Sequence, residues 1–331
     1  KNIGFLMLLY AGTISIFSFK YSLLKDIVTK LKLWNKSASN SLSYLWYNHI
    51  YVTETSETLR NKITLETERI KSVSVHIPTH LKPCNDTEFG HYLAGLIEGD
   101  GHFSNTPQLV IVFNSLDASL AYYLKKQLGY GSINKIKTKN AILLIIAAKK
   151  GIEKIINLIN GKIRTENKYL QITKNILNHP NFIEFSKTIK FKLNLDKNLE
   201  NHWLAGFTDA NGSFQIKAIK RKNKTEIRLN FQLDQKNFHI LILIKDFLGG
   251  NIGYRDSQDT YYYGSTSFGS AKKVINYFDQ YHLLSSKHIN YLKWRKAYII
   301  LQNKDHLNLT GILKIIKLKK TMNRDNISTV I

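Results

Sequence analysis

The sequence predicts an α+β protein made of two related repeats, each an antiparallel sheet with helices on one face, preceded by an N-terminal extension. Two observations carry this prediction. Residues 91–103 return in similar form at residues 202–214, and each copy is followed by the same order of expected strands and helices. An internal repeat of this kind determines the architecture before any single element does. We therefore expect two halves related by a pseudo-twofold axis within one monomer.

The N-terminal extension, residues 1–85, opens with an uncharged run from Ile3 to Phe19. This run is at the lower limit of about 17–25 residues for a membrane-spanning helix. It predicts a weakly membrane-associated helix, a buried helix or the remnant of an upstream fusion. A charged helical pattern follows from Glu54 to Lys71, and Pro78 and Pro83 then indicate a linker because proline breaks helices and ladders.

The first repeat is expected over residues 86–200 and the second over residues 201–331. Each half is predicted to contain a helix, two strands, a helix, two strands and a further helix. The last strand and the helix after it are expected at residues 141–148 and 152–160 in the first half, and at residues 260–268 and 270–281 in the second. Such an order forms an antiparallel sheet that helices cover on one face.

The charge of the chain points to a polyanionic partner. There are 48 Lys and Arg against 24 Asp and Glu, a formal net charge of +24, and nucleic acid is the usual partner of so basic a surface. Codon bias in an AT-rich genome would also raise the lysine content, but it does not deplete acids to the same degree. The single cysteine, Cys84, excludes an internal disulfide and a multi-cysteine zinc site.

The repeated segment has the features of a helix that packs closely against its own second copy. Gly95 and Gly206 lie in stretches of small and apolar residues, and glycine lets another backbone approach closely. Each predicted helix ends in acidic residues followed by Gly101 or Gly212, which suggests a left-handed C-terminal cap. Acids at two converging helix C-termini repel each other and the helix dipoles, and a divalent cation such as Mg²⁺ would relieve that repulsion.

These residues, from His91-Tyr92-Leu93-Ala94-Gly95-Leu96-Ile97-Glu98-Gly99-Asp100 and its second copy, resemble the LAGLIDADG family. The resemblance covers about residues 86–331. It implies that the two motif helices form the central interface of a homing-endonuclease-like fold, with one saddle-shaped sheet from each half straddling a duplex. It also implies DNA cleavage in which the last acid of each motif binds a divalent metal, although some relatives encoded in group I introns assist RNA splicing instead.

Carried over by position, the metal-binding acids of the family fall on Asp100 and on residue 211, which is Asn211. An amide oxygen ligates a cation but carries no charge and cannot accept a proton as a base. We therefore expect a weakened Mg²⁺ site. Glu98 and Asp209, two residues earlier in each motif, are interpreted as structural acids.

Other family positions match less closely. Gln235 is the candidate for the glutamine that approaches the active site, and Asp117 would be its counterpart in the first half. Lys287 matches the active-site lysine that precedes the last helix. Lys168 is its candidate counterpart, with an apparent shift of one residue. A lysine at such a position can stabilise developing charge on phosphate, although a solvated surface lysine is the competing interpretation.

The second half contains a strand with two distinct faces. From Ile227 to Leu233 apolar and polar residues alternate, as in a half-buried strand. Its polar side chains, those of the preceding strand and those of the connecting turn form the predicted nucleic-acid-binding surface: Arg228, Asn230 and Gln232; Gln215 and Lys217; and Lys220, Arg221 and Lys222. The matching first-half segments, 108–113 and 141–146, are almost wholly apolar, so they are either covered on both faces or unsuited to reading bases.

These observations favour an intron-encoded maturase that assists splicing of a group I intron RNA. A metal-dependent DNA homing endonuclease or nickase is the alternative, and a purely structural nucleic-acid-binding protein is a third. The expected partners are the intron RNA, double-stranded DNA in the alternative case, and protein cofactors of splicing. Composition and resemblance together predict a mitochondrial matrix product, with inner-membrane association if the apolar run binds lipid.

Overall fold

The computed structural model describes residues 3–10, 13–20, 72–136, 138–222 and 225–322. The chain forms two compact units, Lys1–Lys71 and Ser72–Ile331, and each is considered by itself. The break between them lies ahead of the boundary expected near residue 85.

In the first unit the apolar run forms a two-stranded antiparallel hairpin. Strands β1 (Ile3–Tyr10) and β2 (Thr13–Lys20) pair from Ile3 opposite Lys20 to Tyr10 opposite Thr13. The prediction of a helix is therefore wrong here, since the run is rich in β-branched and aromatic residues, which favour strands. Among the described residues, none of the helices is both long and apolar enough to cross a membrane. The helical pattern expected from Glu54 to Lys71 lies outside the described residues.

The first repeat is a four-stranded antiparallel sheet with strand order β3-β4-β6-β5. Its motif helix leads directly into the first strand, and two short helices follow the last long one. In chain order the elements are α3 (Asp86–Asp100), β3 (Gly101–Phe103), β4 (Leu109–Asn114), α4 (Ala118–Leu128), β5 (Ser132–Ile136), β6 (Ala141–Ile146), α5 (Lys149–Ile159), α6 (Glu166–Ile172) and α7 (Ile183–Thr188).

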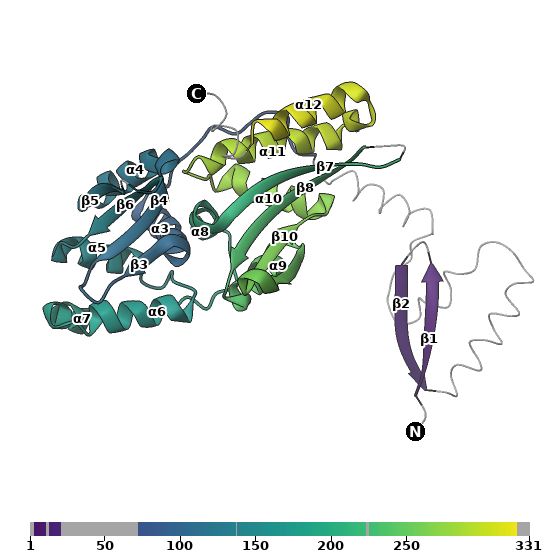
Figure 1. The fold of residues 1–331 in the computed structure, drawn as a ribbon. Coiled ribbons are helices and arrows are strands. Elements are labelled where there is room, and N and C mark those ends of the chain that lie inside the picture. The colour runs from purple at the N-terminus through teal and green to yellow at the C-terminus, as the bar shows by residue number, and fades with distance from the viewer. Residues whose placement is uncertain (1–2, 11–12, 21–71, 137, 223–224, 323–331) are drawn as a thin grey trace, which may run out of the picture. The chain divides into compact units, whose positions relative to one another are not determined.

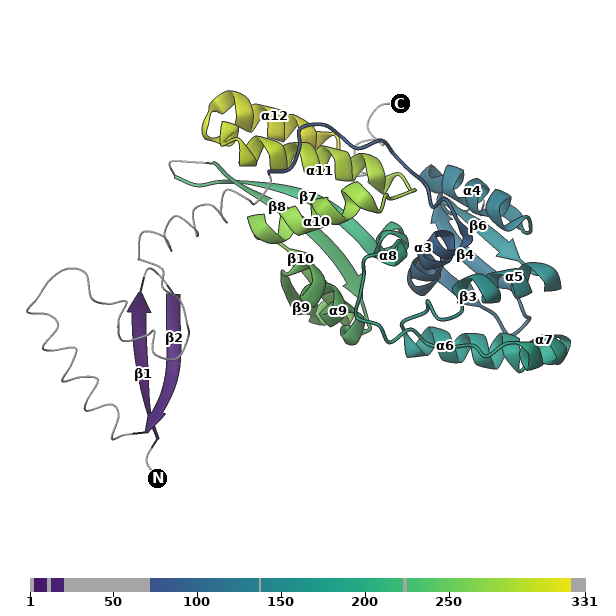
Figure 2. The same cartoon turned by 180° about the vertical axis from the view of Figure 1, so that it is seen from behind.

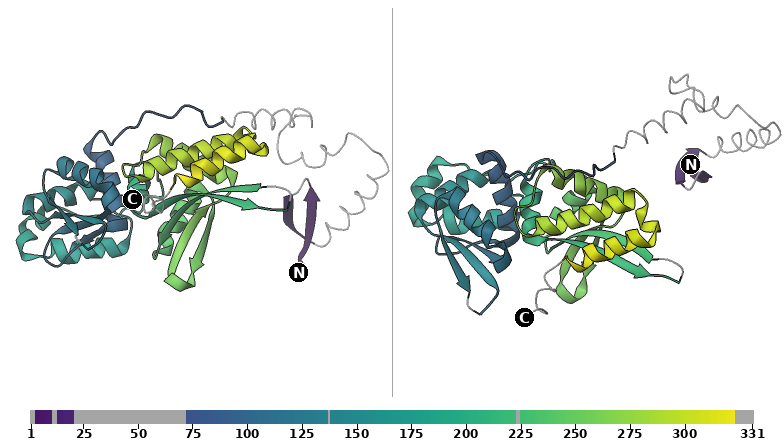
Figure 3. Two further views of the ribbon diagram at one scale, coloured as in Figure 1. Left: turned by 45° about the horizontal axis from the view of Figure 1, so that its top comes forward. Right: turned by 90° about the horizontal axis from the view of Figure 1, so that it is seen from above.

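The second repeat has the same topology, with strand order β7-β8-β10-β9, so the prediction of two α+β repeats with antiparallel sheets is confirmed. Figure 3 shows α11 and α12 over one face of this sheet. In chain order the elements are α8 (Trp203–Asn211), β7 (Gly212–Lys220), β8 (Thr225–Gln235), α9 (Phe238–Leu248), β9 (Asn251–Arg255), β10 (Thr260–Ser265), α10 (Phe268–Gln280), α11 (Lys287–Gln302) and α12 (Leu309–Lys320).

Helices α3 and α8 lie side by side between the two sheets (Figure 1). Their residues from Tyr92 to Ile97 and from Trp203 to Thr208 are buried, and they join the cores of both repeats into one apolar cluster. Each helix is apolar on nearly all sides because it is covered by its own sheet and by the other helix.

Gly101 and Gly212 do not form the expected left-handed caps. Their φ angles are −85° and −87°, which is extended backbone. The structure gives a different reason for glycine. A Cβ on Gly101 would lie 2.7 Å from Ile97 Cα, and one on Gly212 would lie 2.4 Å from Thr208 Cγ2. The chain turns from the helix straight into a strand that folds back against the last helical turn, which leaves no space for a side chain.

The segment from Ser72 to Asn85, which we call the strap, is irregular but closely bound to the second repeat (Figure 2). Val73 exchanges two hydrogen bonds with the side chain of Gln302, at 2.8 and 3.1 Å. Arg295, 1% exposed, donates to the carbonyl oxygens of Ser74 and His76.

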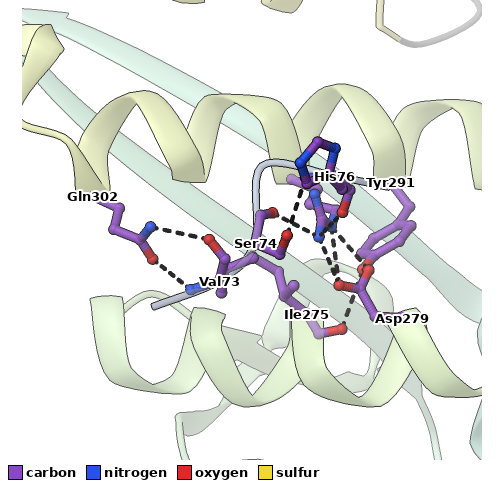
Figure 4. A network of polar contacts seen from close by, with 8 residues as sticks. Val73, Ser74, His76, Ile275, Asp279, Tyr291 and Gln302 are labelled. Atoms are coloured by element: carbon purple, nitrogen blue, oxygen red, sulfur yellow. Dashed lines mark hydrogen bonds and ion pairs between the residues drawn. The ribbon is translucent and has the colours of Figure 1, made fainter. Parts of the chain in front are cut away.

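The arginine of this contact is itself held by an acid. Arg295 forms an ion pair of 2.8 Å with Asp279, which also accepts a hydrogen bond from the Tyr291 hydroxyl. Figure 4 shows the tyrosine and the aspartate beside the strap. The linker predicted from the prolines is therefore part of the second unit, which explains why the break between units comes at residue 71.

Candidate functional site

The two motif helices touch through their glycines. A Cβ on Gly95 would lie 1.9 Å from the carbonyl oxygen of Trp203, and a Cβ on Gly206 would lie 1.9 Å from that of Tyr92. Tyr92 and Trp203 occupy the same position in the two motif copies, so the contact is reciprocal about the pseudo-twofold axis. Only glycine permits this approach of one main chain to another.

The close contact continues to the C-terminal ends of the helices. A Cβ on Gly99 would lie 2.2 Å from Ala210 Cβ and 3.0 Å from Asn211 Nδ2. Asp100 and Asn211, the last residues of α3 and α8, are therefore brought to neighbouring helix ends. The partial negative charge of both helix termini falls on this point.

A lysine lies at each of these helix ends. Lys168 Nζ donates to the carbonyl oxygen of Gly101 at 2.5 Å, and Lys287 Nζ donates to the carbonyl oxygens of Ala210 at 2.7 Å and Thr208 at 3.2 Å. Burial lowers the pKa of Lys168, while the nearby carboxylates of Glu98 and Asp100 oppose that shift. The two predicted lysines thus stand at the same end of the helix pair as Asp100 and Asn211.

Glu98 fixes the loop that leads to α6. It is buried and accepts hydrogen bonds from the backbone N–H groups of Arg164 at 2.8 Å and Thr165 at 2.5 Å. It also accepts one from the indole Nε1 of Trp203, on the opposite motif helix, at 2.5 Å. Burial raises the pKa of Glu98, and these hydrogen bonds counteract the shift.

Asp209 does the same in the second repeat. It accepts from the backbone N–H groups of Leu284 at 2.7 Å and Ser285 at 3.3 Å, from the Ser285 hydroxyl at 2.5 Å, and from the Tyr92 hydroxyl of the opposite motif helix at 2.7 Å. Burial raises its pKa too. Each acid therefore joins the two repeats and anchors the loop that carries a site lysine.

These hydrogen bonds also explain the shift of one residue between the lysines. Because the two acids accept from equivalent amides, Thr165 corresponds to Ser285. Lys287 is two residues beyond its reference position and Lys168 is three residues beyond. The helical turn that begins α6 still brings the Lys168 ammonium group to the end of α3.

Gln235 and Asp117, which the sequence comparison matched, do not occupy equivalent positions in the two repeats. Gln235 is the last residue of β8 and shares the helix-covered face with Leu233; its Oε1 accepts from the backbone of Lys236. Asp117 lies beyond the end of β4, in a 3₁₀ turn, Ser115–Asp117, so the matching of Asp117 to Gln235 is wrong. Its buried carboxylate instead accepts from the backbone N–H of Ser286 at 2.7 Å, and so it supports the lysine loop of the other repeat.

The open face of β7 and β8 carries the polar side chains expected there. The register pairs Gln215 with Asn230 and Lys217 with Arg228, and directly opposed residues share a face. Asn230 Nδ2 lies 3.4 Å from Gln215 Oε1 and 3.3 Å from Gln232 Oε1. Asn230 is only 6% exposed because its neighbours cover it. The three amides thus form one connected row.

An acid at the start of β8, beside the turn after β7, was missed by the sequence interpretation. Lys220 ends β7, and Arg221 and Lys222 follow it. Glu226 forms ion pairs with Arg221 at 3.1 Å and with Arg228 at 2.5 Å, and these two arginines lower its pKa. The spacing of 226 and 228 on one strand face was a signal that could have revealed the second pair. Part of the positive charge of this surface is therefore neutralised internally.

Along β4 and β6 the matching face of the first repeat is apolar and open, although His102 on β3 and Ser132 and Asn134 on β5 share it. Burial alternates along β4 and β6, and Val112 is 45% exposed, so the sheet is not covered on both faces. Of the two alternatives, coverage on both faces is therefore wrong, and the two middle strands of this face offer few polar groups to bases. The first strand is also short, since β3 spans three residues where β7 spans nine.

Comparison with known proteins agrees with the resemblance that the repeated motif shows. A family model described as LAGLIDADG endonuclease matches residues 204–298. An uncharacterized cox1 intron-2 protein of 37.2 kDa from Schizosaccharomyces pombe is 61% identical over 326 residues, which cover 95% of this chain and 97% of that protein.

Two relatives from Saccharomyces cerevisiae carry different functional names. The intron-encoded DNA endonuclease aI3 is 30% identical over 66% of this chain and 65% of its own length. The intron-encoded RNA maturase bI4 is 29% identical over 69% of this chain but only 35% of its own length.

Solved structures share the fold. The meganuclease I-SmaMI bound to uncleaveable DNA matches with a TM-score of 0.55 and 25% identity, covering 71% of this chain and 99% of that one. The same enzyme, bound to an uncleaved DNA target in the presence of calcium ions, matches with a TM-score of 0.53 and 22% identity, covering 74% and 100% of the two chains.

Proposed function

Because this chain belongs to the LAGLIDADG family, we propose that it is an intron-encoded nucleic-acid-binding protein that acts as a maturase for a group I intron RNA. The observation that carries the proposal is the asymmetry of the two repeats. The converging helix ends present one carboxylate and one amide, and only one of the two sheets has a polar, basic face.

The residues at the helix ends fit Mg²⁺ in kind, with one charge fewer than a pair of acids. Mg²⁺ is held by one or two carboxylates together with waters and substrate phosphates, and Asp100 with the amide oxygen of Asn211 meets the lower end of that requirement. Mg²⁺ bound by these two residues would polarise a phosphodiester and activate water. Lys168 and Lys287 would add positive charge against the phosphate.

The maturase proposal places the RNA on the face of β7 and β8. Lys217, Arg228 and the turn from Lys220 to Lys222 supply positive charge for phosphates. Gln215 and Gln232, the more exposed amides of the row, supply hydrogen bonds to exposed bases, and the buried Asn230 holds them in place. Structured RNA is recognised by its shape and its unpaired bases, so a single polar face is sufficient for it.

A specific observation keeps the endonuclease as a second candidate. Asp100 and both lysines lie at the helix ends, so cleavage of one strand, as by a nickase, needs no residue that is missing from that half. Double-stranded DNA is then the partner. The names of the relatives support both candidates, since one is a DNA endonuclease and another an RNA maturase.

We also propose that the protein works in mitochondria. The relative named for a cox1 intron and the AT-type composition, rich in Lys, Asn and Ile, support this origin. Protein cofactors of splicing and contact with the inner membrane belong to the same proposal.

Two variants separate the candidates when purified protein is given intron RNA, and separately the intronless DNA target, in Mg²⁺. We expect Asp100→Asn to abolish any DNA cleavage and to leave splicing within about twofold of wild type, because RNA folding needs the surface rather than the carboxylate. Asn211→Asp should increase cleavage, because it restores the second carboxylate.

Asp246→Asn, an exposed acid on α9, is the control for loss of one negative charge. The maturase proposal fails if Asp100→Asn stops splicing while the protein stays folded and bound to RNA. It also fails if the wild-type protein cuts both DNA strands and does not accelerate splicing.

A further inference from the structure

Three histidines from two distant parts of the sequence meet near the loop that carries Lys287. His80 lies on the strap, His282 lies between α10 and α11, and His288 is the second residue of α11. One ring nitrogen of each lies within 4.8 Å of the others. The ring of His80 is 4.3 Å from that of His288 and 5.2 Å from that of His282, measured between centroids.

The hydrogen bonds of the rings leave nitrogens available for a ligand. His80 Nε2 lies 2.8 Å from the carbonyl oxygen of Leu283, so it donates and the lone pair of that ring is on Nδ1. A histidine that binds a metal usually donates its other N–H to such a carbonyl. The Nδ1 atoms of His282 and His288 are buried and have no hydrogen-bond partner in the part of the chain that the structure describes.

We propose that His80, His282 and His288 bind one transition-metal dication of the zinc class, which fastens the strap to the loop before α11. Imidazole nitrogens suit Zn²⁺ and its neighbours in the transition series, whereas Mg²⁺ requires oxygen ligands. This ion is therefore distinct from the one considered at Asp100 and Asn211.

The dimensions and charge of the cluster are compatible with such an ion. Zn–N bonds of about 2.0–2.1 Å put tetrahedral ligand nitrogens about 3.4 Å apart, so the three nitrogens, which lie within 4.8 Å of one another, would draw closer by small side-chain movements on binding. Asp279, the nearest acid, is paired with Arg295.

The position of the cluster suggests what the ion would do. The strap ends at Asn85, which caps α3, the first motif helix. The loop on the other side donates to Asp209 and carries Lys287 to the helix ends. A metal that joins them would hold the start of the first motif helix against the loop of the second repeat. With three protein ligands, the fourth position stays open to water or to another group.

Zinc binding to the full chain, free of any histidine tag, tests the proposal. We expect one equivalent of Zn²⁺ by calorimetry, and Co²⁺ in its place should give the visible absorption of a four-coordinate ion. His80→Ala should weaken Zn²⁺ binding by more than about 100-fold, since even loss of an outer-shell partner costs about 10–100-fold. His76→Ala is the matched control, because His76 is exposed on the same strap but outside the cluster.

His80→Ala also loses its hydrogen bond to Leu283, so its melting temperature without metal can change for that reason alone. The change in melting temperature that Zn²⁺ causes in each variant is therefore the second, independent measurement. Zn²⁺ should raise the melting temperature of the wild type and of His76→Ala, and a chelator should reverse the rise. It should not raise that of His80→Ala, and excess Mg²⁺ should not replace it. The proposal is overturned if the wild type binds no stoichiometric Zn²⁺, or if His80→Ala binds Zn²⁺ as tightly as His76→Ala does.

Discussion

Replacing Gly206 with alanine, the smallest available change, tests the contact on which the whole arrangement depends. The added Cβ would lie 1.9 Å from the Tyr92 carbonyl oxygen and 2.9 Å from both Tyr92 C and Leu96 N. All three are main-chain atoms, so no side chain can rotate away. Ordinary contact begins at 3.4 Å, and the helices would have to separate locally by about 1.5 Å.

The expected loss of stability follows from two opposing effects. Overpacking a tight contact costs about 1–3 kcal/mol, and a clash with main chain belongs at the upper end. Alanine returns about 1 kcal/mol through its higher helix propensity. The net loss in unfolding free energy is about 2 kcal/mol, or about 4–8 °C in melting temperature for a domain of this size.

Tryptophan fluorescence during urea unfolding measures this loss, because Trp203 is buried at the contact itself. Gly269→Ala is the matched control. Gly269 lies in the first turn of α10, and a Cβ there meets nothing within 4 Å, so this variant should be neutral or slightly stabilised. If Gly206→Ala unfolds at the same urea concentration as wild type or a higher one, the two motif helices do not touch as described.

Two further variants probe charge. Glu226→Gln should tighten RNA binding by about two- to fivefold at low salt, because it releases Arg221 and Arg228 from ion pairs. Filter binding should show no such gain for Glu184→Gln, which breaks only an exposed pair on α7; equal affinities would place the β7–β8 turn outside the RNA interface. Burial and nearby basic groups lower the pKa of His91 to about 4. Between about pH 6.5 and 4 the unfolded chain therefore binds a proton that the folded chain does not. Unfolding free energy should fall as the pH drops through this window, and His91→Gln should make the fall shallower in urea titrations at pH 7.5 and 5; an unchanged slope would contradict the assignment.

The sequence was sufficient for the fold because the fold is repeated. Two copies of the motif determined the paired helices, and period-two alternation from Ile227 to Leu233 identified a strand with one open face. Local patterns of this kind report local structure directly. The apolar run from Ile3 to Phe19 has no such periodicity, and a short apolar run does not distinguish a helix from strands.

The contacts that could not be predicted join residues far apart in the chain. The local sequence gives no signal of the ion pair between Arg295 and Asp279, nor of the hydrogen bonds from Arg295 to the strap. The same holds for Asp117, whose spacing suggested a place beside the active site, but which supports the backbone of Ser286. Acids in a motif show that a carboxylate is needed there, and only the tertiary structure shows which donors it accepts from.

The two repeats agree in the buried acids that hold the molecule together. They differ in the residues that we propose to contact nucleic acid. Glu98 accepts from Trp203 and Asp209 accepts from Tyr92, so each buried acid depends on the other repeat, and loss of either would leave polar groups unpaired in both halves. Asn211 in place of an acid removes no packing.

The apolar face of the first sheet likewise removes no packing from the core. Cutting both strands of a duplex needs a competent acid and a reading face in each half, because the two strands are related by the same twofold symmetry as the repeats. A folded RNA has no such symmetry and offers unpaired bases and an irregular backbone. One basic face, held rigid by a helix pair that both repeats stabilise, meets what recognition of a folded RNA requires but not what cutting both DNA strands requires. This is the physical reason to test splicing before double-strand cleavage.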